Sequence, residues 1–290
     1  MDYLVFVIDF VSSLFFYLQL IFIHNNYVET RIHNAVIGTF FEDGSLNVIR
    51  TASFAEGAES KTTFSLKSGN IKVYVVANVD VDLFSAVSTE TEFKNVILNL
   101  DQNTIPLTAN KLIDVKPYVQ GDESTVTKAT LYLERIVSKI SLSKVEVKLK
   151  ENGYSNATFN IDRVFLHHAN TKSTIDYVTS ESKSGLSESS LMNYKADFWG
   201  NYDRHYFYAF ESNNLRLIIG GWFKDGNRAA EYMYFPIPVK AIHNTHHALT
   251  AIIKGKGVKN PDDNYESSGK LETTLKVLAW NEDNKEVVFE

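Results

Sequence analysis

Hydrophobic and polar residues alternate along most of the chain from about residue 32. This period of two is typical of strands that bury one face. The clearest stretches are residues 35–41, 46–49, 62–66, 71–76, 130–148, 157–167, 204–211, 215–222, 231–239, 248–254 and 270–280. Gly-containing segments at 42–45 and 68–70 separate the first two pairs, so we expect hairpins over residues 35–49 and 62–76.

Two stretches depart from this alternation. Apolar residues between 79 and 100 recur at intervals of three and four, which predicts one or two short amphipathic helices with Thr89 as a possible N-cap. Residues 171–195 are polar and rich in serine, which predicts a surface loop. The pattern as a whole predicts an all-β chain with two β-sandwich domains, 32–130 and 131–290.

The N-terminal residues form a separate segment. Residues 3–23 are an almost unbroken apolar run, long enough to span a bilayer as a helix. Secretory signals begin with Lys or Arg, whereas the early charge here is Asp2 and the first basic residue is Arg31. Three interpretations stay open for residues 1–31: a damaged or misassigned leader or pro-segment, a membrane anchor, and a structured apolar helix or strand.

Composition narrows the function classes. The 290 residues carry a net charge of −6, which argues against nucleic-acid binding because that requires a basic surface. Cysteine is absent, so disulfides, thiol nucleophiles and cysteine metal sites are excluded. The sequence contains no Gly-x-Ser-x-Gly elbow and no phosphate-binding loop. We therefore expect no catalysis and no cofactor.

Histidines and paired aspartates are the two kinds of candidate metal ligand in the sequence. The chain has 8 histidines, and the most closely spaced are His167, His168, His243, His246 and His247. His243 and His247 are four residues apart, but the carboxylate of a metal-binding helix is missing between them, and residues 241–247 fit a turn between strands.

The two pairs of aspartates also match no known metal-binding motif. Asp80 with Asp82 and Asp262 with Asp263 offer oxygen ligands, but neither pair belongs to a twelve-residue calcium loop. Residues 260–264 have the composition of a solvated turn. The sequence therefore predicts no metal site.

Several segments, taken in order, resemble the fimbrillin family of Bacteroidales, which comprises subunits of type V fimbriae and related surface adhesins. They are residues 35–44 (AVIGTFFEDG), 72–78 (KVYVVAN), 133–140 (LERIVSKI), 206–213 (YFYAFESN), 242–261 and 271–280. The resemblance covers about residues 32–290. His243 stands where the family usually has Arg, and the cysteine of the family's lipoprotein leader is absent.

The resemblance implies two sandwiches of transthyretin-like topology in a protein exported to the cell surface. It implies a structural fimbrial subunit whose partners are other fimbrial subunits, with association with the outer membrane and with host or bacterial surface ligands as further expectations. In polymerising members a protease cuts after an arginine near the N-terminus, and the groove that is freed accepts a strand from the next subunit. Such β-augmentation satisfies the unpaired backbone groups of an open sheet edge.

Two sets of residues take these roles in this sequence. Arg31 is the only arginine before the first recognisable strand, so it is the candidate processing site. The C-terminal segment is the candidate donor, with Val277, Ala279, Val287 and Phe289 as pocket fillers. Residues 270–280 fit a final core strand equally well, in which case only the extreme end is donated.

A second function on the same scaffold is open, a surface lipoprotein that binds carbohydrate or another ligand. Its basis is an aromatic cluster around residues 198–208, since sugars stack on exposed aromatic faces. Trp199 and Tyr202 are the candidate stacking residues. Tyr206 and Tyr208 also fit core packing.

Overall fold

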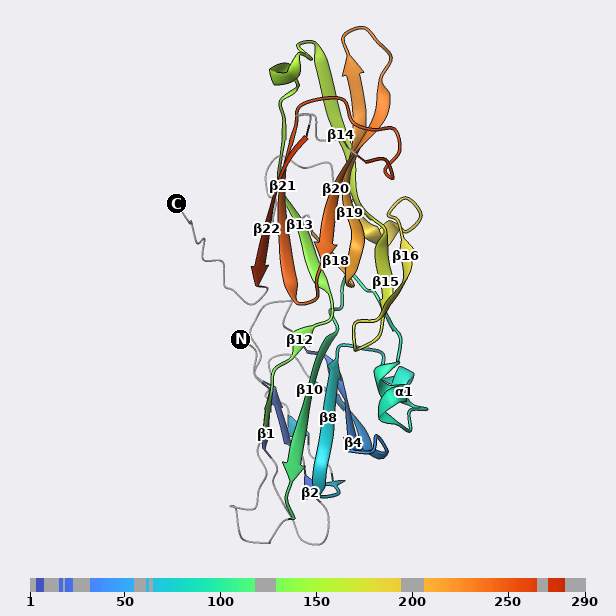
Figure 1. The fold of residues 1–290 in the computed structure, drawn as a ribbon, viewed down its shortest axis with the longest axis vertical. Coiled ribbons are helices and arrows are strands. Elements are labelled where there is room, and N and C mark those ends of the chain that lie inside the picture. The colour runs from blue at the N-terminus through green and yellow to red at the C-terminus, as the bar shows by residue number, and fades with distance from the viewer. Residues whose placement is uncertain are drawn as a thin grey trace, which may run out of the picture. The chain divides into compact units, whose positions relative to one another are not determined.

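The computed structural model describes the backbone of residues 4–7, 16–17, 19–22, 32–54, 61–62, 65–117, 129–193, 206–264 and 271–279. The chain divides into two units (Figure 1). Unit 1 comprises residues 1–98, 103–136 and 174–178, and unit 2 comprises residues 99–102, 137–173 and 179–290. Strands make up most of both units, which confirms the prediction of an all-β fold.

Unit 1 contains a five-stranded antiparallel sheet in the order β12-β10-β8-β4-β5. Its strands are β4 (Asn34–Phe41), β5 (Leu46–Ser53), β8 (Gly69–Ala77), β10 (Leu107–Val115) and β12 (Glu134–Arg135). β4 and β5 form the predicted hairpin, and Gly44 adopts the positive φ of 82° that the turn requires.

The predicted hairpin over residues 62–76 is wrong. β8 pairs with β4 on one side and with β10 on the other, so neither of its edges is left for the residues just before it. Those residues form β6 (Lys61–Thr62) and β7 (Ser65–Leu66), which pair with β3 (Gln19–Phe22) and β2 (Phe16–Tyr17). The apolar run 73–77 is typical of a central strand that is buried on both faces. β8 begins at Gly69, so residues 69–70 belong to this strand and do not form the predicted turn.

A second sheet of unit 1 has the order β11-β1-β3-β6. It adds β1 (Leu4–Val7) and β11 (Ala129–Leu131), and it places part of the N-terminal apolar run in strands. Leu66 and Leu131 join the apolar core that lies on one face of the β4-β8-β10 sheet. In the part of the chain that the structure describes, no helix is long and apolar enough to cross a membrane.

Two short helices cover the other face of β4. These are η2 (Val81–Phe84) and α1 (Glu90–Lys94), and Thr89 caps α1 through a complete capping box with Glu92, as the sequence predicts. The Phe93 ring lies 5.5 Å from that of Phe40 and 4.8 Å from that of Phe84, centroid to centroid. A Cβ on Gly38 would lie 2.6 Å from Phe93 Cε2, so glycine is required beneath this ring.

Unit 2 is a sandwich of two four-stranded sheets. The first has the order β18-β13-β21-β22, with β18 (Tyr206–Ala209), β13 (Ser138–Val147), β21 (Thr245–Ile253) and β22 (Leu271–Ala279). The second has the order β17-β14-β19-β20, with β17 (Met192–Asn193), β14 (Ala157–His167), β19 (Ser212–Asp225) and β20 (Glu231–Ala241). Apolar side chains from both sheets form one buried core. The pair β13–β21 is parallel, and the register along it shifts between Leu142 and Lys144.

The prediction of a surface loop over residues 171–195 is wrong for residues 171–193, which the structure describes. That region contains the end of β15 (Ala169–Ser173), β16 (Thr179–Lys183), η5 (Ser189–Leu191) and β17. β15 and β16 form an antiparallel hairpin whose residues are mostly polar and half-buried or exposed, so its strands lack the apolar alternation by which strands are recognised. The remaining elements are β9 (Leu98–Asn99) and η4 (Leu149–Asn152).

We predict that Phe93→Ala destabilises unit 1 by about 3–5 kcal/mol, because it removes a fully buried ring from the contacts with Phe40 and Phe84. Urea unfolding followed by circular dichroism measures the change. Leu112→Ala is the control: its side chain is 56% exposed on β10, and we expect an effect within about 0.5 kcal/mol. Equal effects of the two substitutions would contradict this assignment of the core.

Candidate functional site

The candidate assembly strands lie at the two ends of the chain. Val277 and Ala279 are in β22, opposite His247 and Thr245 of β21. β22 pairs with β21 over nine residue pairs and is an edge strand of its sheet. Val287 and Phe289 lie outside the described residues, as do Arg31, Trp199 and Tyr202.

Two of the strands before residue 31, β1 and β3, occupy the interior of the second sheet of unit 1. β1 pairs antiparallel with β11 through Leu4 and Leu131, and with β3 through Leu4 and Phe22. β3 in turn pairs with β6, where Ile21 lies opposite Lys61. In this sheet β1 and β3, from the N-terminal segment, therefore lie between β11 and β6, which come from later in the chain.

Of the aromatic cluster, the structure describes Tyr206 and Tyr208. Tyr208 is buried in β18, and the Lys139 ammonium lies 4.4 Å from the centre of the Tyr206 ring. Core packing is thus the structural role of Tyr208.

The histidines near residue 245 do not converge. His243 Nδ1 lies 2.5 Å from Glu211 Oε1, and His246 Nε2 lies 2.8 Å from Ser141 Oγ. His247 is buried, and burial lowers the pKa of its imidazole.

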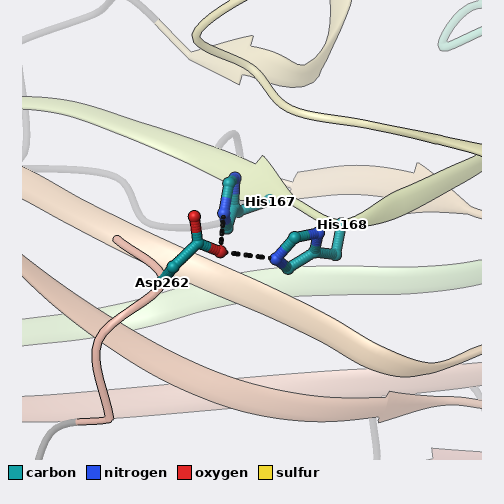
Figure 2. A group of neighbouring side chains, drawn as sticks. All are labelled: His167, His168 and Asp262. Carbon is teal, nitrogen blue, oxygen red and sulfur yellow. Dashed lines mark hydrogen bonds and ion pairs between the residues drawn. The ribbon is translucent and has the colours of Figure 1, made fainter. Parts of the chain in front are cut away.

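The other histidine pair, His167 and His168, does converge, and it meets Asp262 of the predicted turn at 260–264. His167 Nε2 lies 2.8 Å and His168 Nε2 lies 2.7 Å from the same oxygen, Asp262 Oδ1 (Figure 2). His167 is the last residue of β14 and is buried, whereas the side chains of His168 and Asp262 are 42% and 54% exposed. The two hydrogen bonds hold the pKa of the Asp262 carboxyl below its usual value.

The backbone explains how two adjacent histidines reach one carboxylate. Consecutive side chains of a strand point to opposite faces. His168 has φ = 57°, in the left-handed region, so the alternation is broken between β14 and β15. The two rings consequently lie side by side, with centroids 4.0 Å apart.

An arginine holds the loop that carries the aspartate. Arg216 lies opposite His167 in the β14–β19 pairing. Its Nη1 donates to the carbonyls of Pro261, Asp262 and Asp263 at 3.1, 2.9 and 3.1 Å, and its Nη2 donates to Asn264 Oδ1 at 3.1 Å. The loop that carries Asp262 is therefore held by β19, the strand that pairs with β14 and its His167.

Ser184 contacts the far side of the His167 ring. Its Oγ lies 2.8 Å from His167 Nδ1 and also accepts the Leu186 N–H at 3.3 Å. Ser184, His167 and Asp262 thus form a hydrogen-bonded series, but the nitrogens are exchanged relative to a serine hydrolase, in which Ser faces Nε2 and Asp faces Nδ1. Asp262 is also shared with a second imidazole, so we interpret the series as orienting the His167 ring.

A polar pocket of about 820 Å³ adjoins this cluster within unit 2. His168, Arg216 and Asn264 line it, together with Glu211 and Lys240. No Phe, Tyr or Trp is among its described lining residues, which are mostly polar.

Comparisons with solved structures agree on the fold. A fimbrilin (FimA) from Porphyromonas gingivalis aligns with a TM-score of 0.70 at 18% identity, over 95% of this chain and 96% of that one. A protein from Bacteroides eggerthii assigned to cell adhesion gives 0.68 at 19% identity, over 86% and 89%. The tip fimbrial protein Mfa3 from P. gingivalis gives 0.53 at 14%, over 87% and 96%. No protein-family model matches the sequence, and no curated protein matches it. The chain therefore has the fold of fimbrillins, as the sequence resemblance predicts.

We predict that Arg216→Lys loosens the loop at 260–264, because one ammonium cannot reproduce a fork that meets four acceptors. Amide hydrogen exchange in the loop should rise on the order of tenfold, the loss of about one net hydrogen bond. Arg163→Lys, in the neighbouring strand β14, is the control and should leave the loop unchanged. Unaltered protection in Arg216→Lys would show that the arginine does not hold the loop.

Proposed function

We propose that the chain is a non-catalytic structural subunit of a bacterial cell-surface fimbria, and that subunits polymerise by strand donation after removal of the N-terminal segment. Other fimbrial subunits are its partners, and the assembled fibre is associated with the outer membrane. The fold is shared over nearly the whole length with a fimbrilin and over most of it with a fimbrial tip protein, and this supports the general role.

The sheet order in unit 1 is the observation that carries the mechanism. β1 and β3 precede Arg31, whereas their outer neighbours β11 and β6 follow it. Cleavage after Arg31 with release of residues 1–31 would leave a gap between β11 and β6, with unpaired N–H and C=O groups on both sides. The gap is two strands wide, so an incoming strand can hydrogen-bond to the freed edge of β11 or of β6, which favours association over an open edge exposed to water.

The C-terminal segment is the donor in this proposal. It comprises β22, with Val277 and Ala279, and the residues that follow, with Val287 and Phe289. Each pair is spaced by two, so both side chains of a pair face the same side of an extended strand and can fill alternate pockets. β22 already pairs with β21 of its own sheet, so donating β22 would break those hydrogen bonds. Donating the residues after 280 leaves that pairing intact.

A ligand-binding role remains the second candidate on this scaffold, and the polar pocket of unit 2 is the feature that favours it. Its described lining offers amide, carboxylate and ammonium groups, which suit a polar ligand held by hydrogen bonds. Trp199→Ala with a glycan panel tests the stacking version of this role.

We predict that an arginine-specific protease converts the purified chain to one that starts at Ile32, and that the product forms a ladder of oligomers resistant to mild denaturation. Intact mass, N-terminal sequencing and unheated gel electrophoresis measure the two steps. Arg31→Ala should stay uncleaved and monomeric. Arg50→Ala, in β5, is the matched control and should behave as the unmodified chain.

Two outcomes would contradict this mechanism. Processed protein that stays strictly monomeric would rule out strand donation. A ladder formed equally by Arg31→Ala would rule out release of residues 1–31 as the trigger.

We predict that removing residues 281–290 abolishes the ladder and leaves the circular dichroism spectrum of the monomer unchanged. Val287→Asp and Phe289→Asp should act similarly, because a charge in an apolar acceptor pocket is costly. Lys285→Gln is the control in the same segment. If the truncated chain polymerises normally and Val277→Asp does not, the donor is β22 itself; if both polymerise normally, the C-terminal segment is not the donor.

A further inference from the structure

We propose that His167, His168 and Asp262 form a binding site for a divalent transition-metal ion of the zinc class. The site lies wholly within unit 2, on β14, the β14–β15 junction and the loop at 261–264. It is separate from the strands that the proposed polymerisation uses.

The donor set suits this class of metal. Two imidazole nitrogens and one carboxylate oxygen lie within 4.8 Å of one another, and both nitrogens face the Asp262 oxygen (Figure 2). Zinc binds such ligands at about 2.0–2.2 Å, which places tetrahedral donors about 3.3 Å apart. The observed separations of 2.7 and 2.8 Å need an opening of about half an ångström, which small rotations of the exposed His168 and Asp262 side chains supply. Three protein ligands leave a fourth position for water.

The identity of the ligands excludes hard cations. Ca²⁺ takes six to eight oxygens and Mg²⁺ takes an octahedral oxygen shell, whereas two imidazoles favour zinc, copper, cobalt or nickel.

Ser184 provides the second coordination sphere that a metal-bound histidine requires. Metal binding through Nε2 needs a hydrogen on Nδ1 and an acceptor for it, and Ser184 Oγ lies 2.8 Å from Nδ1. Without metal, the hydroxyl can instead donate to Nδ1 while Nε2–H donates to Asp262. A rotation of one hydroxyl group therefore accommodates both states.

The backbone of His168 is the independent observation for a site. A single histidine would be enough to tie Asp262 to β14. The second histidine reaches the same oxygen only because His168 adopts φ = 57°, a left-handed conformation that non-glycine residues seldom adopt. Such strain persists where the surrounding structure enforces it and is concentrated at functional positions. The Arg216 fork fixes the third ligand in addition, so all three are oriented before a metal arrives.

The test is a titration of the full chain with Zn²⁺ in competition with a chromophoric chelator. We expect one equivalent to bind at this site, and Co²⁺ in its place to give the visible absorption of a four- or five-coordinate nitrogen–oxygen site. His168→Asn and Asp262→Asn should each weaken that equivalent at least about tenfold. Asn tolerates the left-handed backbone at 168, so folding is preserved. His33→Ala, an exposed histidine of unit 1, is the control and should bind as the unmodified chain.

A second readout separates this site from other histidines of the chain. Zn²⁺ should raise the melting temperature of the unmodified protein and not that of the His168→Asn/Asp262→Asn double variant. Ser184→Ala should weaken zinc binding by about tenfold and keep the one-to-one ratio. Equal zinc affinity of the double variant and the unmodified chain, no binding at millimolar Zn²⁺, or preference for Ca²⁺ over Zn²⁺ would each overturn the proposal.

Discussion

Backbone hydrogen bonding between strands is the constraint on which this structure depends. Every N–H and C=O group of a buried sheet needs a partner, and a strand at a sheet edge has partners on one side only. In unit 1, β1 and β3 supply partners to β11 on one side and to β6 on the other. The apolar run at the start of the chain thus forms part of the sheet, and the strands around it depend on it for their hydrogen bonds.

The same constraint separates what the sequence could predict from what it could not. Alternation places β5, β14 and β20 correctly, because each of these strands packs one face on a core and exposes more of the other. β4, which is buried on both faces, is placed by its apolar run and the turn that follows it. It fails for β6 and β7, whose partners are β3 and β2 in the N-terminal segment. Pairing between segments so far apart leaves no local pattern. The β15–β16 hairpin was missed for a different reason: most of its side chains are partly or fully exposed.

The candidate metal site shows the same limit for side chains. The histidine pair and the aspartate pair were both visible as candidates, and each was assigned to a simpler role because its local spacing matches no metal motif. What joins them is the β14–β19 pairing that sets Arg216 opposite His167, together with the loop that Arg216 holds. A left-handed residue within an HisHis dipeptide has no sequence signature of its own, since histidine usually occupies other regions of the backbone map. Such a site becomes visible only when the register of the strands is known.

Strand donation and a stable subunit require different properties of the same chain. Strand donation needs a sheet that loses β1 and β3 without collapsing, and the five-stranded sheet of unit 1 provides the support, since its central strands β4, β8 and β10 are paired on both sides by residues after 32. The Phe40, Phe84 and Phe93 cluster covers one face of that sheet with residues that cleavage does not touch. In unit 2 the sandwich core likewise comes from residues after 99. The described residues of both cores thus all follow Arg31, which makes an exchangeable strand before Arg31 compatible with a stable subunit.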